Sequence, residues 1–252
     1  MLCLEPSFIP SAEDVERYKR LRELSRRLNQ EIVKTIPRRA LFKVGKAIGI
    51  PIEGNSFFFE SADETSVLMD CCLYDWIENG KSLMEKYAES NLRLDAAEDE
   101  LLHTYLQAKY RILISRSRVD GAGAEFVDLF SAEKIFIMDI AMSRTPLGMA
   151  YATRTIPLDR FWITGGTALP TDSNGIHQAI TRLSQHRSSD NSGFVDPHTM
   201  ALTFVRTLLE AGSMERITYQ AIEDQKRTRS RRTGRARTTS RRLNPSGGSL
   251  NA

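Results

Sequence analysis

Apolar residues recur every three or four positions in the first part of the chain. The spacing holds from Val15 to Ile36 and is typical of an amphipathic helix whose apolar stripe faces a core. Ser11 and Asp14 stand ahead of it in the capping-box arrangement, and Pro37 follows it. The sequence therefore predicts a long first helix that ends before Pro37.

A second, shorter helix is predicted around residues 41–48, because Gly49 and a nearby proline supply a stop signal. We expect the first two helices to form a hairpin. Two further capping-box patterns, in residues 61–64 and 95–98, precede new apolar stretches with helical spacing. The N-terminal region up to residue 109 is therefore predicted to be helical.

The period changes from Tyr110 onward. Short runs rich in Ile, Phe, Val and Thr alternate with turn residues such as Asp120 and Gly121, which is the pattern of β-strands. Strands in such close succession favour an antiparallel meander that curls into a small barrel or a strongly bent sheet packed on the helices. Five strands are predicted, near residues 111–119, 124–130, 134–140, 149–156 and 160–168.

Two helices close the body of the protein. One is predicted near residues 173–186, and the other is opened by Asp196 with Pro197 in its first turn. The predicted fold class is therefore α+β, with an N-terminal helical layer, a curled antiparallel five-stranded sheet or small barrel, and two C-terminal helices. The chain is divided into a helical region (1–109), a β-module (110–170), closing helices (171–225) and a cationic arm (226–252).

The β-module has a distinctive order of turn and strand residues, namely Asp128, Leu129, Asp139, Ser143, Arg144, Gly148, Arg154, Thr164, Gly165 and Pro170. In this order it resembles the β-module of uncharacterised bacterial proteins, several of which also carry a SEC-C metal-binding motif. The resemblance covers about a quarter of the chain and implies a fold. The cysteine-rich SEC-C cluster is missing here, so the resemblance implies no zinc site.

Charge divides the chain more sharply than hydropathy does. The 252 residues hold 35 Lys and Arg against 32 Asp and Glu, a net charge of +3. Nine of these bases and no acid fall in residues 226–252, which leaves 26 bases against 32 acids, a net charge of −6, for residues 1–225. The nine bases are Lys226, Arg227, Arg229, Arg231, Arg232, Arg235, Arg237, Arg241 and Arg242.

The segment 226–252, called the arginine arm below, is almost free of apolar residues. It cannot contribute to a core, and repulsion among its charges predicts a disordered, extended segment. Arginine outnumbers lysine eight to one, which favours bidentate contacts with phosphate, and no aromatic side chain is present to stack on bases. We therefore expect the arm to bind nucleic acid, RNA or the ribosome rather than DNA, without sequence specificity.

Two features of the body also resemble nucleic-acid-binding surfaces, and for both a structural role is expected. Residues 110–170 hold seven bases against six acids, too balanced a charge for a nucleic-acid platform, so the aromatic residues there are expected in the core. These are Phe126, Phe136, Tyr151, Phe161 and Trp162. A basic stripe on the first two helices is expected to be a solvated face that complements acidic helices; it comprises Arg17, Arg20, Arg26, Arg27, Lys34, Arg38, Arg39, Lys43 and Lys46.

Motifs that would support catalysis are sparse. Glu100 and His103 have the Glu-x-x-His spacing of di-iron bundles, but such sites need this motif twice and the chain has it once. A surface helix with a coincidental Glu and His explains the spacing better. The sequence has no G-x-S-x-G elbow, and Gly165 and Gly166 are not followed by the lysine of a phosphate-binding loop. Glu100 and His103 are therefore the candidate catalytic residues, and neither a metal nor a cofactor is predicted.

The cysteines and the hydropathy profile address the location of the protein. Cys3, Cys71 and Cys72 are odd in number and lack C-x-x-C spacing, so no disulfide framework is expected, and the adjacent pair is expected to pack in the core. The first residues lack a signal-peptide pattern, and no apolar run approaches the roughly 18 residues of a membrane span. A cytoplasmic protein that does not interact with membranes is predicted.

These observations favour a non-catalytic binding or adaptor protein, whose arm tethers it to nucleic acid and whose N-terminal amphipathic helices contact another protein. Two alternatives stay open. The first is an enzyme whose active site is assembled from scattered residues, with a cleft of converging titratable side chains as its mark. The second is a structural subunit of a larger assembly. The arm itself could instead solubilise the protein, fold back on the acidic segment 51–109, or bind an acidic protein or a membrane surface.

Overall fold

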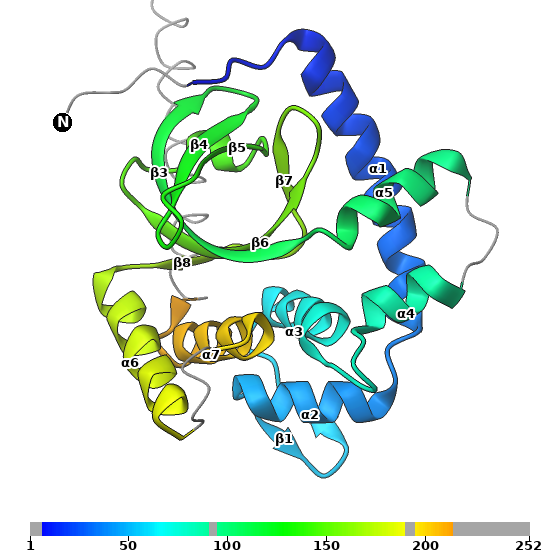
Figure 1. The fold of residues 1–252 in the computed structure, drawn as a ribbon, viewed down its shortest axis with the longest axis vertical. Coiled ribbons are helices and arrows are strands. Elements are labelled where there is room, and N and C mark those ends of the chain that lie inside the picture. Colours follow the sequence, from blue (N-terminus) through cyan, green and yellow to red (C-terminus); the bar gives the residue numbers. More distant parts are fainter. Residues whose placement is uncertain (1–6, 91–94, 190–194, 214–252) are drawn as a thin grey trace, which may run out of the picture. The chain divides into compact units, whose positions relative to one another are not determined.

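The computed structural model describes residues 7–90, 95–189 and 195–213. The chain divides into two units, and all of the described residues belong to the first, Met1–Met214. In this unit, helices pack beside a small β-barrel (Figure 1). The helices are α1 (Ala12–Lys34), α2 (Arg38–Ile48), α3 (Ala62–Asp75), α4 (Leu83–Ser90), α5 (Ala96–Tyr105), α6 (Ser173–Ser189) and α7 (Pro197–Glu210).

The predicted helix starts are confirmed by their hydrogen bonds. At α1 the Ser11 hydroxyl accepts the backbone N–H of Asp14 at 3.2 Å, and the Asp14 carboxylate accepts the backbone N–H of Ser11 at 2.9 Å. α5 begins with the same reciprocal pair, formed by Asp95 and Glu98. α3 begins with only half of the box, because the carboxylate of its third residue accepts the N–H one position before the N-cap.

The second helix does not form the predicted hairpin with the first. Pro37 lies between them with an extended backbone (φ −72°, ψ 146°), which directs the chain away from α1. α2 packs against α3 and α7 instead. α1 lies against α5, where the hydroxyls of Ser25 and Tyr105 share a hydrogen bond of 2.7 Å. The apolar face of α2 is therefore covered by helices that come later in the chain.

Five strands close into a barrel in the order β3, β4, β5, β7, β6 and back to β3. All neighbours are antiparallel except β5 and β7, which run parallel at the register pair Ile137–Trp162. The predicted small barrel is thus confirmed, but it is a mixed barrel, because the strand that closes it returns parallel to β5. Its strands are β3 (Lys109–Val119), β4 (Gly123–Asp128), β5 (Lys134–Met138), β6 (Ala150–Pro157) and β7 (Trp162–Thr164).

The predicted fifth strand, residues 160–168, is interrupted. β7 ends at Thr164, and an additional strand β8 (Leu169–Thr171) pairs with β6 further along. Since β3 occupies the other edge of β6, β7 and β8 share one edge, and residues 165–168 loop out between them. Gly166 in this loop faces α3, where a Cβ atom would lie 3.3 Å from Oδ1 of Asp70. Gly166 lets the loop approach the helix closely.

The interior of the barrel is filled by apolar side chains. Four of the five aromatic residues predicted in the core, Phe126, Phe136, Tyr151 and Phe161, are buried. The fifth, Trp162, is half-buried under the guanidinium of Arg111, 4.7 Å from its ring centroid. The main cluster comprises Leu113, Ala124, Phe126, Ile135, Ile137, Met142 and Tyr151.

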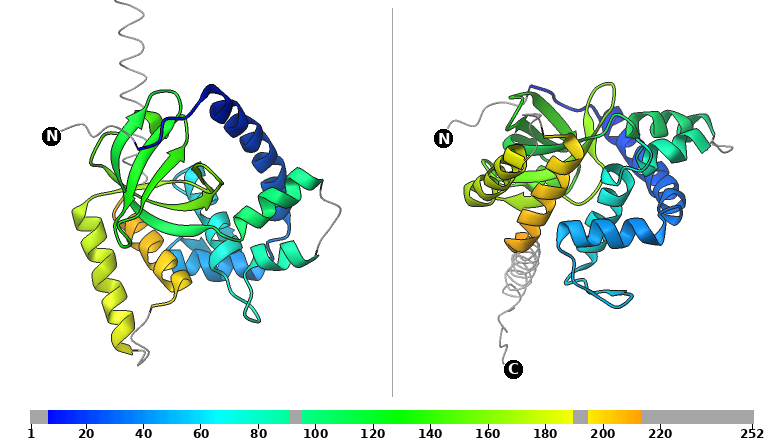
Figure 2. Two further views of the ribbon diagram at one scale, coloured as in Figure 1. Left: turned by 45° about the horizontal axis from the view of Figure 1, so that its top comes forward. Right: turned by 60° about the horizontal axis from the view of Figure 1, so that its bottom comes forward.

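The helices form layers on one side of the barrel. α3 and α7 lie between the barrel and α2, which carries the short hairpin of β1 (Ile52–Glu53) and β2 (Ser56–Phe57) at its far side (Figure 1). α6 lies beside α7 (Figure 2). The two predicted closing helices are confirmed, and Asp196 caps α7 by accepting the backbone N–H groups of His198 and Thr199 at 3.0 and 2.9 Å.

The close approach of Gly123 to the backbone of Ile137 gives a stability prediction. A Cβ atom on Gly123 would lie 2.0 Å from the backbone carbonyl oxygen of Ile137, and no side-chain rotation relieves that overlap. We expect Gly123→Ala to lower the free energy of unfolding by roughly 3 kcal/mol or more. Gly121→Ala is the matched control, since it has open space and a φ of +77° and is expected to cost about 1 kcal/mol. Equal losses in urea unfolding would contradict this.

Candidate functional site

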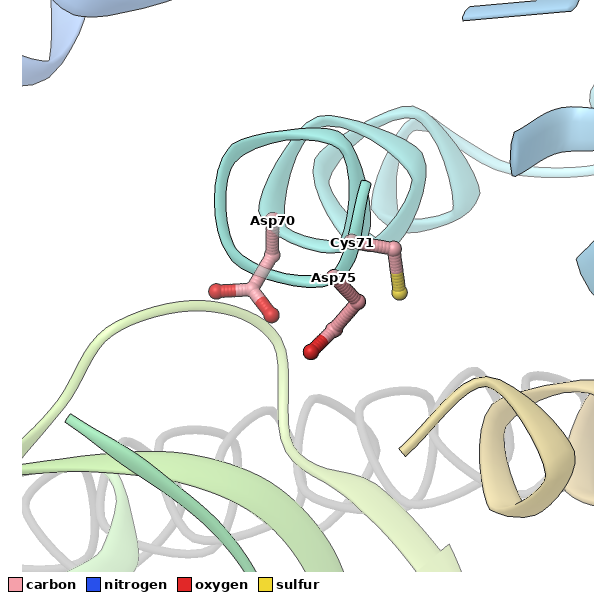
Figure 3. Close-up of side chains that lie close together, drawn as sticks. All are labelled: Asp70, Cys71 and Asp75. Atoms are coloured by element: carbon pink, nitrogen blue, oxygen red, sulfur yellow. The ribbon is translucent and has the colours of Figure 1, made fainter. Parts of the chain in front are cut away.

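A buried arginine joins the barrel to the helical layer. Arg154, in β6, is only 5% exposed. Its Nε donates to Oδ2 of Asp70 at 2.9 Å, and its Nη2 donates to Oδ2 of Asp75 at 2.5 Å. Both carboxylates come from α3, where Figure 3 shows them on the same side of the helix together with Cys71. We call Asp70, Asp75 and Arg154 the Arg154 cluster.

Two aromatic rings fix the plane of the guanidinium. The ring centroid of Tyr74, from α3, lies 4.3 Å from Cζ of Arg154, and that of Tyr110, from β3, lies 5.5 Å away. Cation–π attraction of this kind is stronger at a desolvated site, and Arg154 is largely buried. Burial disfavours the charged guanidinium, but the carboxylates of Asp70 and Asp75 outweigh it and raise the pKa of Arg154. The arginine is therefore a permanent cation in a fixed orientation.

The same carboxylates raise the question of a metal ion. One ligand atom each of Asp70, Cys71 and Asp75 lies within 4.8 Å of the others. The guanidinium of Arg154 already neutralises this position, and burial holds the pKa of the Cys71 thiol well above its ordinary value, so no thiolate is available. The arrangement therefore favours an ion-pair cluster over a metal centre.

A histidine extends the cluster to the surface. His198, in the first turn of α7, has its Nδ1 3.4 Å from Oδ1 of Asp75, the carboxylate whose other oxygen accepts from Arg154. The hydrogen bond to Asp75 raises the pKa of His198 above its ordinary value, although partial burial opposes it. The Asp75 carboxylate thus lies between a permanent cation and a titratable one.

These groups line one cavity of about 540 Å³. Its wall is built from four separate parts of the chain: the end of α3, the start of α4, β3 with β6, and the start of α7. The polar wall residues are Asp75, Ser82, Glu85, Lys109, Arg154 and His198. A cleft with converging titratable side chains is the feature expected of a site assembled from scattered residues.

The candidate catalytic residues from the sequence do not lie at this cavity. Glu100 and His103 are exposed on α5, and Nδ1 of His103 lies 2.8 Å from the backbone carbonyl oxygen of Asp99. Neither lines the cavity beside Arg154. The nine basic residues of the arginine arm, Lys226 to Arg242, lie outside the described residues.

The sequence contains a signal for the cluster that spacing rules do not detect. Arg154 is a charged residue inside β6, whose other residues are apolar or threonine, and Asp70 and Asp75 lie in the apolar stretch of α3. A charge within a buried stretch predicts a buried partner, but it does not identify the partner. His198 is adjacent to the proline that opens α7, so its position suggests only a helix start.

A family model matches residues 12–204 of the chain. The chain belongs to DUF7986, a family of unknown function. The DUF7986 match includes the Arg154 cluster, His198 and every strand of the barrel, and it ends before the arginine arm. No curated protein and no solved structure matches the chain.

None of the helices in the described part of the chain is long and apolar enough to cross a lipid bilayer.

The Arg154 cluster gives a second stability prediction. Arg154→Leu leaves two buried carboxylates without their cation, and we expect it to lower the free energy of unfolding by about 3–5 kcal/mol. Adding Asp70→Asn and Asp75→Asn removes these charges and should restore part of the loss. Arg26→Leu is the control, since Arg26 is 64% exposed beside Glu23, and the expected change is below about 0.5 kcal/mol. Equal urea unfolding curves for the two single variants would contradict the prediction.

The His198–Asp75 pair gives a pH prediction. Because the folded-state pKa of His198 is raised, the stability it contributes is fully present below the unfolded value of about 6.5 and is lost as the pH rises through the folded value. We expect His198→Asn to be less stable than the unmodified chain at about pH 6, and the difference to shrink toward about pH 9. Urea unfolding across this range measures it. A difference that is constant or grows with pH would refute the assignment.

Proposed function

We propose that the protein is a non-catalytic nucleic-acid-binding adaptor whose arginine arm attaches it to phosphate backbones, with RNA or the ribosome preferred to DNA. One observation supports this above all others: nine bases and no acid stand in residues 226–252, beside a body of net charge −6. Guanidinium groups make bidentate contacts with phosphate, and a segment without aromatic residues does not discriminate among bases.

Several basic residues of the body pair with carboxylates, which favours the arm as the segment that contacts phosphate. On the basic stripe, Arg17 pairs with Asp159, Arg27 with Glu98 and Arg39 with Glu78. The barrel aromatics predicted in the core are buried or half-buried, so they do not present a stacking platform on the described surface. The phosphate contacts are therefore assigned to the arm.

Exposed apolar residues beside α2 support the adaptor role. Phe58 and Phe59 are 49% and 37% exposed, and they follow Phe57, whose ring centroid lies 4.8 Å from that of Phe42 in α2. Exposed aromatic side chains that adjoin one another are typical of protein contact surfaces. We propose that this face of the N-terminal region contacts another protein in the cytoplasm.

The resemblance of residues 110–170 to bacterial proteins that carry a SEC-C motif is kept as part of this proposal. This chain lacks the cysteine-rich SEC-C cluster and has the arginine arm instead.

The cavity beside Arg154 favours a second candidate function, a protein that binds or converts a small molecule. Asp75, Arg154 and His198 come from three different elements and line one cavity of about 540 Å³. Convergence of this kind is more frequent at ligand sites than on other surfaces. The two candidates are compatible, because the cavity and the arm use different residues.

The arm predicts a strong salt dependence. With most of its nine charges on phosphates, the affinity for a single-stranded RNA should fall by about three to five decades between about 50 and 200 mM salt. We expect deletion of residues 226–252 to abolish retention on RNA and on ribosomes at both salt concentrations. Fluorescence anisotropy with labelled RNA, and sedimentation with ribosomes, measure the two.

Two variants of the arginine arm refine this experiment. Changing the eight arginines to lysine keeps the charge and should keep the salt slope with weaker binding, whereas changing them to glutamine should abolish binding. Unchanged retention after deletion would refute the proposal. Equal binding to polyglutamate and RNA would refute the preference for nucleic acid.

A further inference from the structure

One edge of the Arg154 guanidinium is not used by the protein. Nε and Nη2 donate to Asp70 and Asp75, while Nη1 donates to none of the described residues. Within the described chain, the polar side-chain atoms that are closed off without a partner belong to Tyr110, Arg111 and Ser117, so Nη1 is not closed off. Arg154 is also one of the residues that line the cavity. A cation that is 95% buried therefore borders a cavity while its Nη1 has no acceptor among the described residues.

His198 lines the same cavity and has a second unused nitrogen. Its Nδ1 faces the Asp75 carboxylate and therefore carries the proton, which leaves Nε2 without a partner among the described residues. The charged groups around the ring are Asp75 from α3, Glu85 from α4, Asp196 before α7 and Arg154 from β6. Three carboxylates against one cation favour the imidazolium, whose Nε2 is then a donor.

Asp75 fixes the two donors relative to each other. Its Oδ2 accepts from Arg154 at 2.5 Å, and its Oδ1 lies 3.4 Å from Nδ1 of His198. Both cationic side chains are therefore anchored to one carboxylate and line one cavity. Donors held in place before a ligand arrives lose little conformational entropy on binding.

We propose that the cavity binds a small molecule carrying a carboxylate or phosphate group, with the oxyanion held between Nη1 of Arg154 and Nε2 of His198. Asp70 and Asp75 are matched by Arg154 and His198, Lys109 adds a cation at the exposed rim, and the carboxylate of Asp196 accepts the backbone N–H groups of His198 and Thr199. The carboxylate of Glu85 is engaged by the backbone N–H and hydroxyl of Ser82, at 2.7 and 2.9 Å.

The remaining wall sets the size and character of the ligand. A volume of about 540 Å³ is that of a metabolite-sized molecule. Apolar side chains also line the cavity, among them Met84, Leu106 and Met200. A ligand with one oxyanion and a short apolar body fits this mixed lining. None of the residues that line this cavity belongs to the arginine arm, so small-molecule binding here can be tested independently of nucleic-acid binding.

The test follows the imidazole of His198 by NMR in the full-length chain, at constant pH and ionic strength. The probes are hexanoate, the uncharged analogue hexanamide, and inorganic phosphate. The His198 signal is identified by its loss in His198→Gln, and the signal of His177, exposed on α6, serves as the pH reference. We expect hexanoate, phosphate or both to shift the His198 signal saturably while hexanamide and the His177 signal stay unaffected.

The pattern of responses to the three probes identifies the type of ligand that carries the oxyanion. A response to hexanoate alone assigns a carboxylate with an apolar body, a response to phosphate alone assigns a phosphate-bearing ligand, and both together support the shared chemistry. No saturable shift with either probe overturns the proposal. An equal response to hexanamide also overturns it, because the charge would then play no part.

Three variants complete the test. Met200→Trp narrows the cavity without changing a residue of the Arg154 cluster and should weaken binding at least about tenfold. His177→Ala removes an exposed imidazole elsewhere and should leave binding unchanged. Arg154→Lys should also weaken binding, and its circular dichroism spectrum shows whether it folds. Full affinity in folded Met200→Trp would refute the cavity as the site.

Discussion

The ion pairs of Arg154 hold the barrel and the helices in register. The guanidinium belongs to β6, which pairs with β3, β7 and β8, and the carboxylates belong to α3, which packs on α2, α4 and α7. A buried arginine cannot lose its charge, so α3 must stay where Asp70 and Asp75 reach it. The loop at Gly166 approaches Asp70 from the barrel side, and His198 approaches Asp75 from α7. The cavity lies where these elements meet around the guanidinium of Arg154.

Much of the architecture could be predicted from local sequence patterns. Capping boxes and apolar spacing place α1 and α5, and period-two runs place the barrel strands, because both signals act within a few residues. Ser82 and Glu85 form the same box at α4, a helix too short for its apolar spacing to stand out. The parallel closure of β5 on β7 could not be predicted, since it depends on contacts made across the closed barrel.

The site is less predictable than the fold for a physical reason. A short Glu-x-x-His spacing draws attention to Glu100 and His103, yet both face solvent on one helix. The residues that converge, Asp75, Arg154 and His198, are separated by long stretches of chain and share no motif. Only their presence in otherwise apolar or helix-opening positions marks them. A charged residue within an otherwise apolar stretch indicates a buried ion pair, and its partner becomes known only from the fold.

The position of α2 has a consequence for how the chain is made. Its apolar face is covered by α3 and by α7, and α7 begins 149 positions after α2 ends. During synthesis, the ribosome therefore releases α2 long before the helix that completes its packing. Until α7 emerges, the N-terminal helices keep apolar surface open to water and to chaperones. The emergence of α7 therefore completes the packing of α2.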